Sequence, residues 1–155
     1  MNMGALIFLH VLGAVLFLGN IITAAFWKLS AERGQDLAHL RRVARNVMHA
    51  DYWFTLPGVI LLLATGHIMA ALNGYSLAEL NWMTASEALF VLSGLIWGIL
   101  LIPAQRTMMK QSVIAEAEGA LTAAYRKASR TWDVFGTLVI LIPLFVLYLM
   151  LVKPF

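Results

Sequence analysis

Three side chains that can bind a metal or carry a proton lie within long apolar runs of this sequence: His10, His67 and Glu87. An ionisable group in a bilayer costs free energy unless it faces protein and finds a partner, so the first hypothesis for such a residue is a functional one. Two neutral imidazoles on facing helices match the axial ligands of a heme iron, and two imidazoles with a carboxylate match a directly bound metal ion. This chemistry requires that the fold bring the three residues to one place.

The composition indicates an integral membrane protein. Apolar residues make up 61% of the 155 positions and charged residues 12%, against roughly 25% charged residues in soluble domains. The charges separate four apolar runs, at about residues 4–27, 52–72, 82–105 and 134–152, and each run has the roughly 17 to 25 residues that cross a bilayer. Because backbone groups in lipid need internal partners, we expect an all-α, antiparallel bundle of four transmembrane helices that forms a single membrane domain.

The basic residues predict the orientation of these spans. Of the 11 lysines and arginines, only Lys153 lies outside the two connections between spans one and two and between spans three and four. The positive-inside rule therefore predicts that both connections are cytoplasmic and that both termini lie on the outer side of a bacterial inner membrane. The basic charge then contacts lipid head groups, not nucleic acid. We expect the first run to be a retained helix, since no basic residues precede it and it is longer than a signal-peptide core.

The three ionisable residues are predicted to lie at one depth. His10 and His67 are each six residues from the outer end of their spans, and Glu87 is five residues from the outer end of its span, so all three lie roughly 7 to 9 Å below that boundary. The small residues Gly13 and Ala14 near His10 leave room for close helices or for a planar cofactor. A structural role also remains open for each residue, because a lone histidine or glutamate can hydrogen-bond a neighbouring helix or reach the head groups. The chain has no cysteine, which excludes thiolate metal sites and disulfides.

The two basic connections carry weaker signals. Apolar residues recur at helical spacing in residues 36–49 and arginines occupy the other side, which predicts an amphipathic helix on the cytoplasmic surface. Residues 107–130 favour helical extensions of spans three and four, with Gly119 as the break. Asp51 and Asp133 open their predicted spans and are expected to cap them.

Two further residue types are expected to have structural roles. Tryptophans fall at the predicted membrane boundaries and suggest an aromatic belt: Trp27, Trp53, Trp82 and Trp132. The prolines within the spans predict kinks: Pro57, Pro103 and Pro143.

Several segments resemble a known family of bacterial membrane proteins. They are HVLGAVLFLGN from His10, HADYWFTLPGVILLLATG from His49, LIPAQR from Leu101, YRKASRTWDVFG from Tyr125 and MLVKP from Met150. These strings are similar to those of the predicted integral membrane proteins grouped as domain of unknown function 2269. The resemblance covers nearly the whole chain and implies a four-helix fold in the inner membrane, but that family has no settled activity.

A more distant resemblance is to the HemJ-type protoporphyrinogen oxidases, which are four-helix membrane proteins that bind b-type heme. Those proteins also have a histidine early in span one, as His10 is here, and a Lys-Pro-Phe ending, as at residues 153–155. Where they carry a histidine and a lysine after a tryptophan in span three, this chain has Trp82-Met83-Thr84-Ala85-Ser86. The resemblance therefore implies heme binding more than porphyrinogen oxidation.

Together these observations predict a small inner-membrane protein with a b-type heme in the outer half of the bundle. His10 is the predicted first axial ligand and His67 the second, with Glu87 tuning the potential or relaying a proton. The expected role is electron transfer with a membrane redox partner or a second copy, and oxidoreductase activity stays open. One alternative is a copper-like metal-binding or transport accessory protein that uses the same three residues with methionines: Met1, Met3 and Met83. Another alternative is a scaffold without a cofactor.

Overall fold

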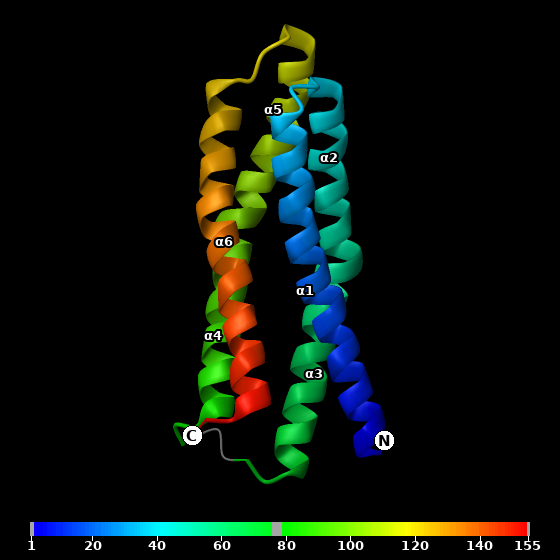
Figure 1. The fold of residues 1–155 in the computed structure, drawn as a ribbon, viewed down its shortest axis with the longest axis vertical. Helices are drawn as coiled ribbons and strands as arrows, with labels where there is room; N and C mark the ends of the chain where they lie inside the picture. The colour runs from blue at the N-terminus through cyan, green and yellow to red at the C-terminus, as the bar shows by residue number, and fades with distance from the viewer. Residues whose placement is uncertain (1, 76–78, 155) are drawn as a thin grey trace.

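The computed structural model describes residues 2–75 and 79–154, so Met1 and Phe155, both mentioned above, lie outside it. The chain forms helices, of which four continuous stretches are long and apolar enough to cross a membrane: Met3–Arg33, Leu37–Leu72, Trp82–Glu118 and Ala123–Val152. They pack as an elongated antiparallel bundle with both termini at one end (Figure 1). The predicted all-α, four-helix membrane fold is confirmed. In chain order the elements are α1 (Met3–Arg33), α2 (Leu37–Ala50), η1 (Asp51–Thr55), α3 (Leu56–Leu72), α4 (Trp82–Ile96), η2 (Trp97–Leu101), α5 (Ile102–Glu118) and α6 (Ala123–Val152).

The second and third stretches each contain one turn of π-helix, η1 and η2. Each of these turns ends two residues before a proline, Pro57 or Pro103. Proline has no N–H to donate, and a wider turn is one of the few ways in which a helix continues past it. The amide of Leu56 accordingly bonds the carbonyl of Asp51, and the amide of Ile102 bonds that of Trp97. At two of the three prolines for which kinks were predicted, the structure therefore has π turns that leave both stretches continuous, and the third, Pro143, lies inside the continuous helix α6.

The helix predicted for residues 36–49 is present as α2, but it runs through η1 into α3 and packs along α1 and α5. It therefore stands along the bundle and does not lie flat on a membrane surface (Figure 1). Its apolar side, which includes Leu40, Ala44 and Val47, is buried against those helices. The amphipathic pattern was correctly recognised, but protein covers the apolar side where we expected lipid.

The bundle has two halves with different packing. The basic half comprises α2, α5 and the adjoining parts of α1 and α6, and there α2 packs on α1 and α5, while α5 packs on α6. The termini half comprises α3, α4 and the other ends of α1 and α6. There α1 packs on α3, and α4 packs on α6. No described Cα atom of α3 lies within 8 Å of a Cα atom in α4 or α6. No described Cα atom of α1 lies within 8 Å of a Cα atom in α4. Figure 1 shows the α1/α3 pair standing apart from the α4/α6 pair.

The hydrophobic core belongs mainly to the basic half. Its buried members come from α2, η2, α5 and α6 and include Leu40, Leu101, Met108, Tyr125 and Trp132. Trp132 is only 8% exposed, so its predicted place in an aromatic belt is wrong, whereas Trp27 and Trp53 are exposed as expected. The largest cluster of buried apolar side chains therefore joins the helices of this half.

In the termini half, α1 and α3 approach each other at two glycines. A Cβ atom at Gly58 would lie 2.9 Å from both the carbonyl oxygen of Gly13 and the amide nitrogen of Phe17, and one at Gly13 would lie 3.0 Å from the carbonyl oxygen of Gly58. These distances leave no room for a side chain at Gly58. The close crossing of α1 and α3 therefore depends on the absence of a Cβ atom at this position. This crossing sets the register between α1 and α3.

The helix ends follow local rules. Gly119 ends α5 in the left-handed conformation, with φ 73° and ψ 11°, as expected for the predicted break. The helices α2 and α6 are capped by Asp36 and Thr122, whose side chains accept backbone N–H groups. The predicted capping roles of Asp51 and Asp133 are therefore wrong, because the helices begin more than two turns before those residues.

Candidate functional site

His10 is held in one orientation by the neighbouring helix α3. Its Nδ1 atom lies 2.9 Å from Oγ1 of Thr65, and that hydroxyl donates to the carbonyl of Leu61 at 2.5 Å. Because the hydroxyl proton of Thr65 is directed to Leu61, its oxygen is the acceptor and His10 Nδ1 carries the proton. In this tautomer the lone pair lies on Nε2, which is the arrangement found in histidines that bind a metal or a heme iron.

The helices place His10 through the glycine crossing described above. His10 lies one turn before Gly13 on α1, and Thr65 lies two turns after Gly58 on the antiparallel α3. Because the two backbones touch at the glycines, the imidazole can reach a hydroxyl as short as that of threonine. The Thr65 side chain is itself buried, so this hydrogen bond is shielded.

His67 has both ring nitrogens engaged. Nδ1 lies 2.8 Å from the carbonyl oxygen of Leu63, and Nε2 lies 2.8 Å from Oε1 of Glu87. The carbonyl can only accept, so Nδ1 carries a proton, and a second proton lies between Nε2 and the carboxyl group. The side chains of His67 and Glu87 are 51% and 34% exposed. As the structure stands, His67 is an ion-pair partner that joins α3 to α4, and it has no free lone pair.

The three residues do lie at one depth, as predicted. His67 and Glu87 are in contact, and Thr65, the partner of His10, precedes His67 by two residues, or about 3 Å along a helix. They nevertheless form two separate contacts, because Thr65 and His67 point to different sides of α3. Within residues 2–75 and 79–154, no three His, Asp or Glu side chains are placed to hold a metal ion.

The methionines named for copper capture differ in their surroundings. Met83 is buried on α4 and Met3 is exposed at the start of α1, while Met1 lies outside the described residues. The three-residue metal site predicted as an alternative is thus not formed in the described part of the chain.

A buried carboxylate that we had treated as a helix cap lies where the two halves meet. Asp51 is 8% exposed, and its Oδ1 accepts hydrogen bonds from Asn20 at 3.0 Å and Thr55 at 2.9 Å, while Oδ2 accepts one from Gln105 at 3.1 Å. Trp97 lines the same small cavity as Asp51. Asp51 and Trp97 are the first residues of the two π turns, so η1 and η2 meet at this carboxylate.

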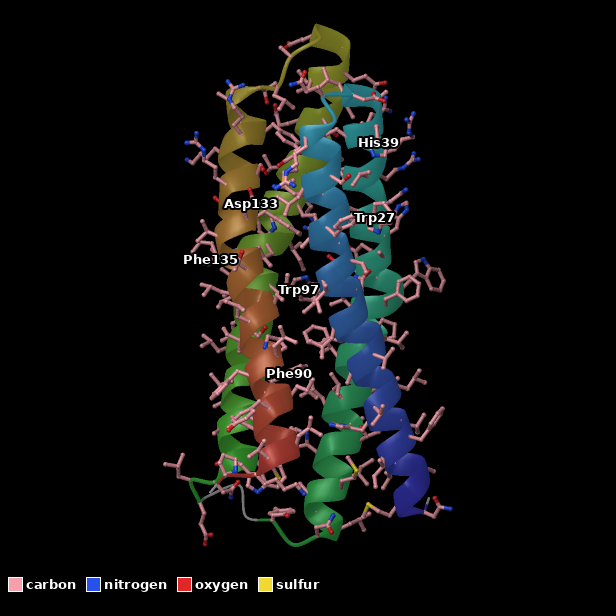
Figure 2. The ribbon with its side chains drawn as sticks, viewed as in Figure 1. Trp27, His39, Phe90, Trp97, Asp133 and Phe135 are labelled. Atoms are coloured by element: carbon pink, nitrogen blue, oxygen red, sulfur yellow. The ribbon has the colours of Figure 1, made fainter. Side chains whose placement is uncertain are left out.

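A second polar cluster fills the basic half around Lys28, which is 4% exposed. Its Nζ atom lies 3.0 Å from Glu32, 2.5 Å from Asp133 and 2.6 Å from Ser129. The hydroxyl groups of Ser129 and Tyr125 both donate to Glu32, at 2.7 and 3.0 Å. Lys28 also lies 5.4 Å from the ring centre of Trp132. Asp133 therefore pairs with a lysine of another helix, and Figure 2 shows it in the upper part of α6, away from the chain termini.

The sequence held only partial signals for these two networks. Lys28 and Glu32 have the spacing of a helical ion pair, but their link to α6 spans about a hundred residues of chain. Asp51 and Gln105 lie on different helices, and their pairing depends on two π turns. No local pattern predicts either contact.

Four apolar spans with ionisable side chains between them define an integral membrane protein of the helical-bundle class. The chain belongs to the family described as predicted integral membrane protein (DUF2269), whose sequence profile matches residues 5–154. This confirms the resemblance identified from the sequence. Neither curated proteins nor solved structures gave a match.

Proposed function

We propose that this protein binds a b-type heme between its helix pairs in the termini half, with His10 as an axial ligand, and that it takes part in electron transfer. The observation that supports this best is the directed chain from His10 Nδ1 to Thr65 to the carbonyl of Leu61. It fixes the imidazole plane and leaves Nε2 as the basic nitrogen. Second hydrogen bonds of this kind orient ligating histidines and raise their basicity.

The packing of the termini half is consistent with a planar apolar group. No described Cα atom of α3 lies within 8 Å of one in α4 or α6, and no described Cα atom of α1 lies within 8 Å of one in α4. A contact across this separation is the edge-to-face pair of Phe17 and Phe90, whose ring centres are 5.5 Å apart, and Figure 2 shows Phe90 between the α1/α3 pair and the α4/α6 pair. When bound, heme supplies one-electron exchange between ferric and ferrous iron.

His67 is less well prepared than His10 to hold the iron of a heme. His67 was predicted to fill it, but its Nε2 is engaged with Glu87. For His67 to bind the iron, its contact with Glu87 would have to open. The proton that the two side chains share would then stay on Glu87 or leave the pair. The structure therefore supports His10 as the ligand on which heme retention depends, with His67 and Glu87 forming the polar edge of the site.

The setting of this site follows from the charge distribution. We propose that the basic half faces the cytoplasm of a bacterial cell and that the termini half faces the outer side of the inner membrane, because the lysines and arginines gather in the basic half. Electron transfer needs a donor and an acceptor, which we propose are a membrane redox partner or a second copy of this chain.

Absorption spectra test this proposal. The protein is purified in detergent from heme-replete cells and measured oxidised and then dithionite-reduced, with iron determined on the same sample. We expect a sharp reduced α band and about one iron per chain. Protein with neither would overturn heme binding and favour the scaffold alternative, and copper or zinc in place of iron would favour the metal alternative.

Matched variants test the ligand. His10→Ala is expected to lose the α band, whereas His67→Ala and Glu87→Gln keep most of the heme and shift only the potential. Loss of heme in both His10→Ala and His67→Ala would show that the bis-histidine arrangement predicted from the sequence is the correct one. Full heme content in His10→Ala would exclude His10 as a ligand.

A further inference from the structure

The exposed side of α2 carries a run of basic residues. Arg42, Arg45 and His49 follow one another at spacings of three and four residues, so they lie on one side of the helix. All three are exposed, while the apolar side of α2 is buried. Neither arginine has an ion-pair partner among the described residues, whereas the neighbouring Arg41 pairs with Glu116. We call Arg42, Arg45 and His49 the arginine face.

The arginine face lies at the depth of an exposed tryptophan of α1. Lys28 of α1 lines one small cavity together with Ala44 and Val47 of α2. Trp27, which precedes Lys28, and Arg45, which follows Ala44, therefore stand at nearly one depth along the bundle. The side chain of Trp27 is 56% exposed, and Figure 2 shows it on the α1/α2 side of the bundle.

Trp53 marks the other limit of this zone. It follows His49 by four residues and is 77% exposed. Eight residues separate it from Arg45, which is about 12 Å of helix. Exposed tryptophans of a membrane protein lie at the level of the lipid head groups. The arginine face thus begins at head-group level, and beyond Trp53 the exposed apolar residues of α3, such as Leu56 and Ile60, suit acyl chains.

The charges around the arginine face favour an anion. The 14 residues of α2 include three arginines and two histidines but no acid. The acids that flank α2 are Asp36, at the end away from the tryptophans, and Asp51, which is buried and bonded to other helices. On α6, by contrast, the exposed Lys127 and Arg130 are followed by Asp133, whose side chain is 41% exposed. An anion at the membrane surface therefore meets less repulsion on α2.

We propose that the arginine face binds the phosphate group of an anionic phospholipid such as phosphatidylglycerol. The guanidinium groups of Arg42 and Arg45 have the planar shape that matches phosphate oxygens, and a ring N–H of His49 is a further donor. Trp53 borders the site on the membrane side. A soluble acidic partner would not require exposed tryptophans at the depth of the cations, so the tryptophans favour a lipid. The site does not include His10, so it does not depend on heme.

Native mass spectrometry of the detergent-purified protein tests this site. The protein is titrated with phosphatidylglycerol and, separately, with phosphatidylcholine of the same acyl chains, and the apparent Kd of the first bound lipid is measured. We expect phosphatidylglycerol to bind about tenfold more tightly, because each arginine near the head groups strengthens binding of anionic lipid several-fold. The double variant Arg42→Gln with Arg45→Gln should reduce this preference to less than about twofold.

The matched control is the double variant Lys127→Gln with Arg130→Gln. It removes the same charge from exposed positions of α6. Its depth is similar to that of Arg45, because the adjacent Ser129 bonds Lys28. We expect this control to keep the preference of the unchanged protein for phosphatidylglycerol.

Each outcome supports or overturns the proposal. Equal binding of both lipids by the unchanged protein overturns it and leaves the arginines to an acidic soluble partner. An equal loss of preference in the two double variants also overturns it, because the preference would then follow net charge and not the arginine face. If the α2 double variant does not fold, as judged by circular dichroism and gel filtration, Arg45→Gln alone replaces it. We expect that variant to lower the preference about threefold, and an unchanged preference would contradict the site.

Discussion

The basic half and the termini half of this bundle are built from the same four stretches but are held together differently. In the basic half, large apolar side chains and the Lys28 and Asp51 networks fill the space between helices that pack closely. In the termini half, two helix pairs are bridged by His67 with Glu87 and by Phe17 with Phe90. The difference shows that one bundle can combine an end whose helices share a buried core with an end where two helix pairs meet through a few side-chain contacts.

The largest stability loss is expected from Lys28→Met. It removes the cation from two carboxylates, and breaking a buried ion pair in this way typically costs 3 to 5 kcal/mol, so we expect about 3 kcal/mol because Asp133 stays partly hydrated. Unfolding by sodium dodecyl sulfate, followed by circular dichroism, measures the loss. Arg41→Met is the matched control, since its pair with Glu116 is exposed, and should change stability by less than about 1 kcal/mol. Equal losses in both variants would show that the buried pairs of Lys28 contribute no more to stability than the exposed pair of Arg41 and Glu116.

Leu101→Ala is expected to destabilise the protein by about 2 kcal/mol. The side chain is 4% exposed in the core of the basic half, and its loss leaves a cavity. The value is at the low end for such a change, because the unfolded side chain enters detergent and not water. Ile99→Ala, at a lipid-facing position 66% exposed, should have little effect in the same assay. A larger loss of stability in Ile99→Ala than in Leu101→Ala would show that the side chain at the lipid-facing position is packed more tightly than the one in the core.

Gly58→Ala tests the crossing of α1 and α3 and is expected to cost about 1 to 2 kcal/mol. Its Cβ atom would lie 2.9 Å from backbone atoms of α1, so the helices must move apart, as in other overpacked sites. The His10 to Thr65 hydrogen bond should weaken with them, which predicts reduced heme retention together with lower stability. Gly98→Ala is the control, since no described atom outside its own stretch of helix lies within 4 Å of that Cβ position. Unchanged stability in Gly58→Ala would show that the crossing adjusts freely.

The smallest change in stability, below about 1 kcal/mol, is expected from Glu87→Gln. The pair with His67 is partly exposed, so its main effect should be on the spacing of the helix pairs. Spin labels at Ile68 and Val91, both exposed, report that spacing by double electron–electron resonance. We expect a broader distance distribution in Glu87→Gln than in the unchanged protein. An identical distribution would mean that other contacts set the separation.

The sequence by itself determined the class, the presence of four long apolar helices and several helix ends. Runs of apolar residues between charges predict transmembrane helices because backbone groups in lipid must bond within their own segment. The break at Gly119 and the end of α3 before Gly74 follow equally from local chemistry, since both glycines have positive φ. The common depth of His10, His67 and Glu87 could also be predicted, because the rise of a helix is constant.

Only the tertiary structure decided what each ionisable residue contacts. The depth of a residue does not determine to which side of its helix the side chain points. His10 and His67 were predicted to meet, but His10 contacts Thr65 and His67 contacts Glu87. Asp51 and Asp133 looked like caps because their helices were expected to begin there, but both helices extend well beyond the predicted boundaries and turn these carboxylates inward. The physical reason is that hydrophobic patterns record which residues avoid water, whereas a polar contact depends on the rotation and register of two packed helices.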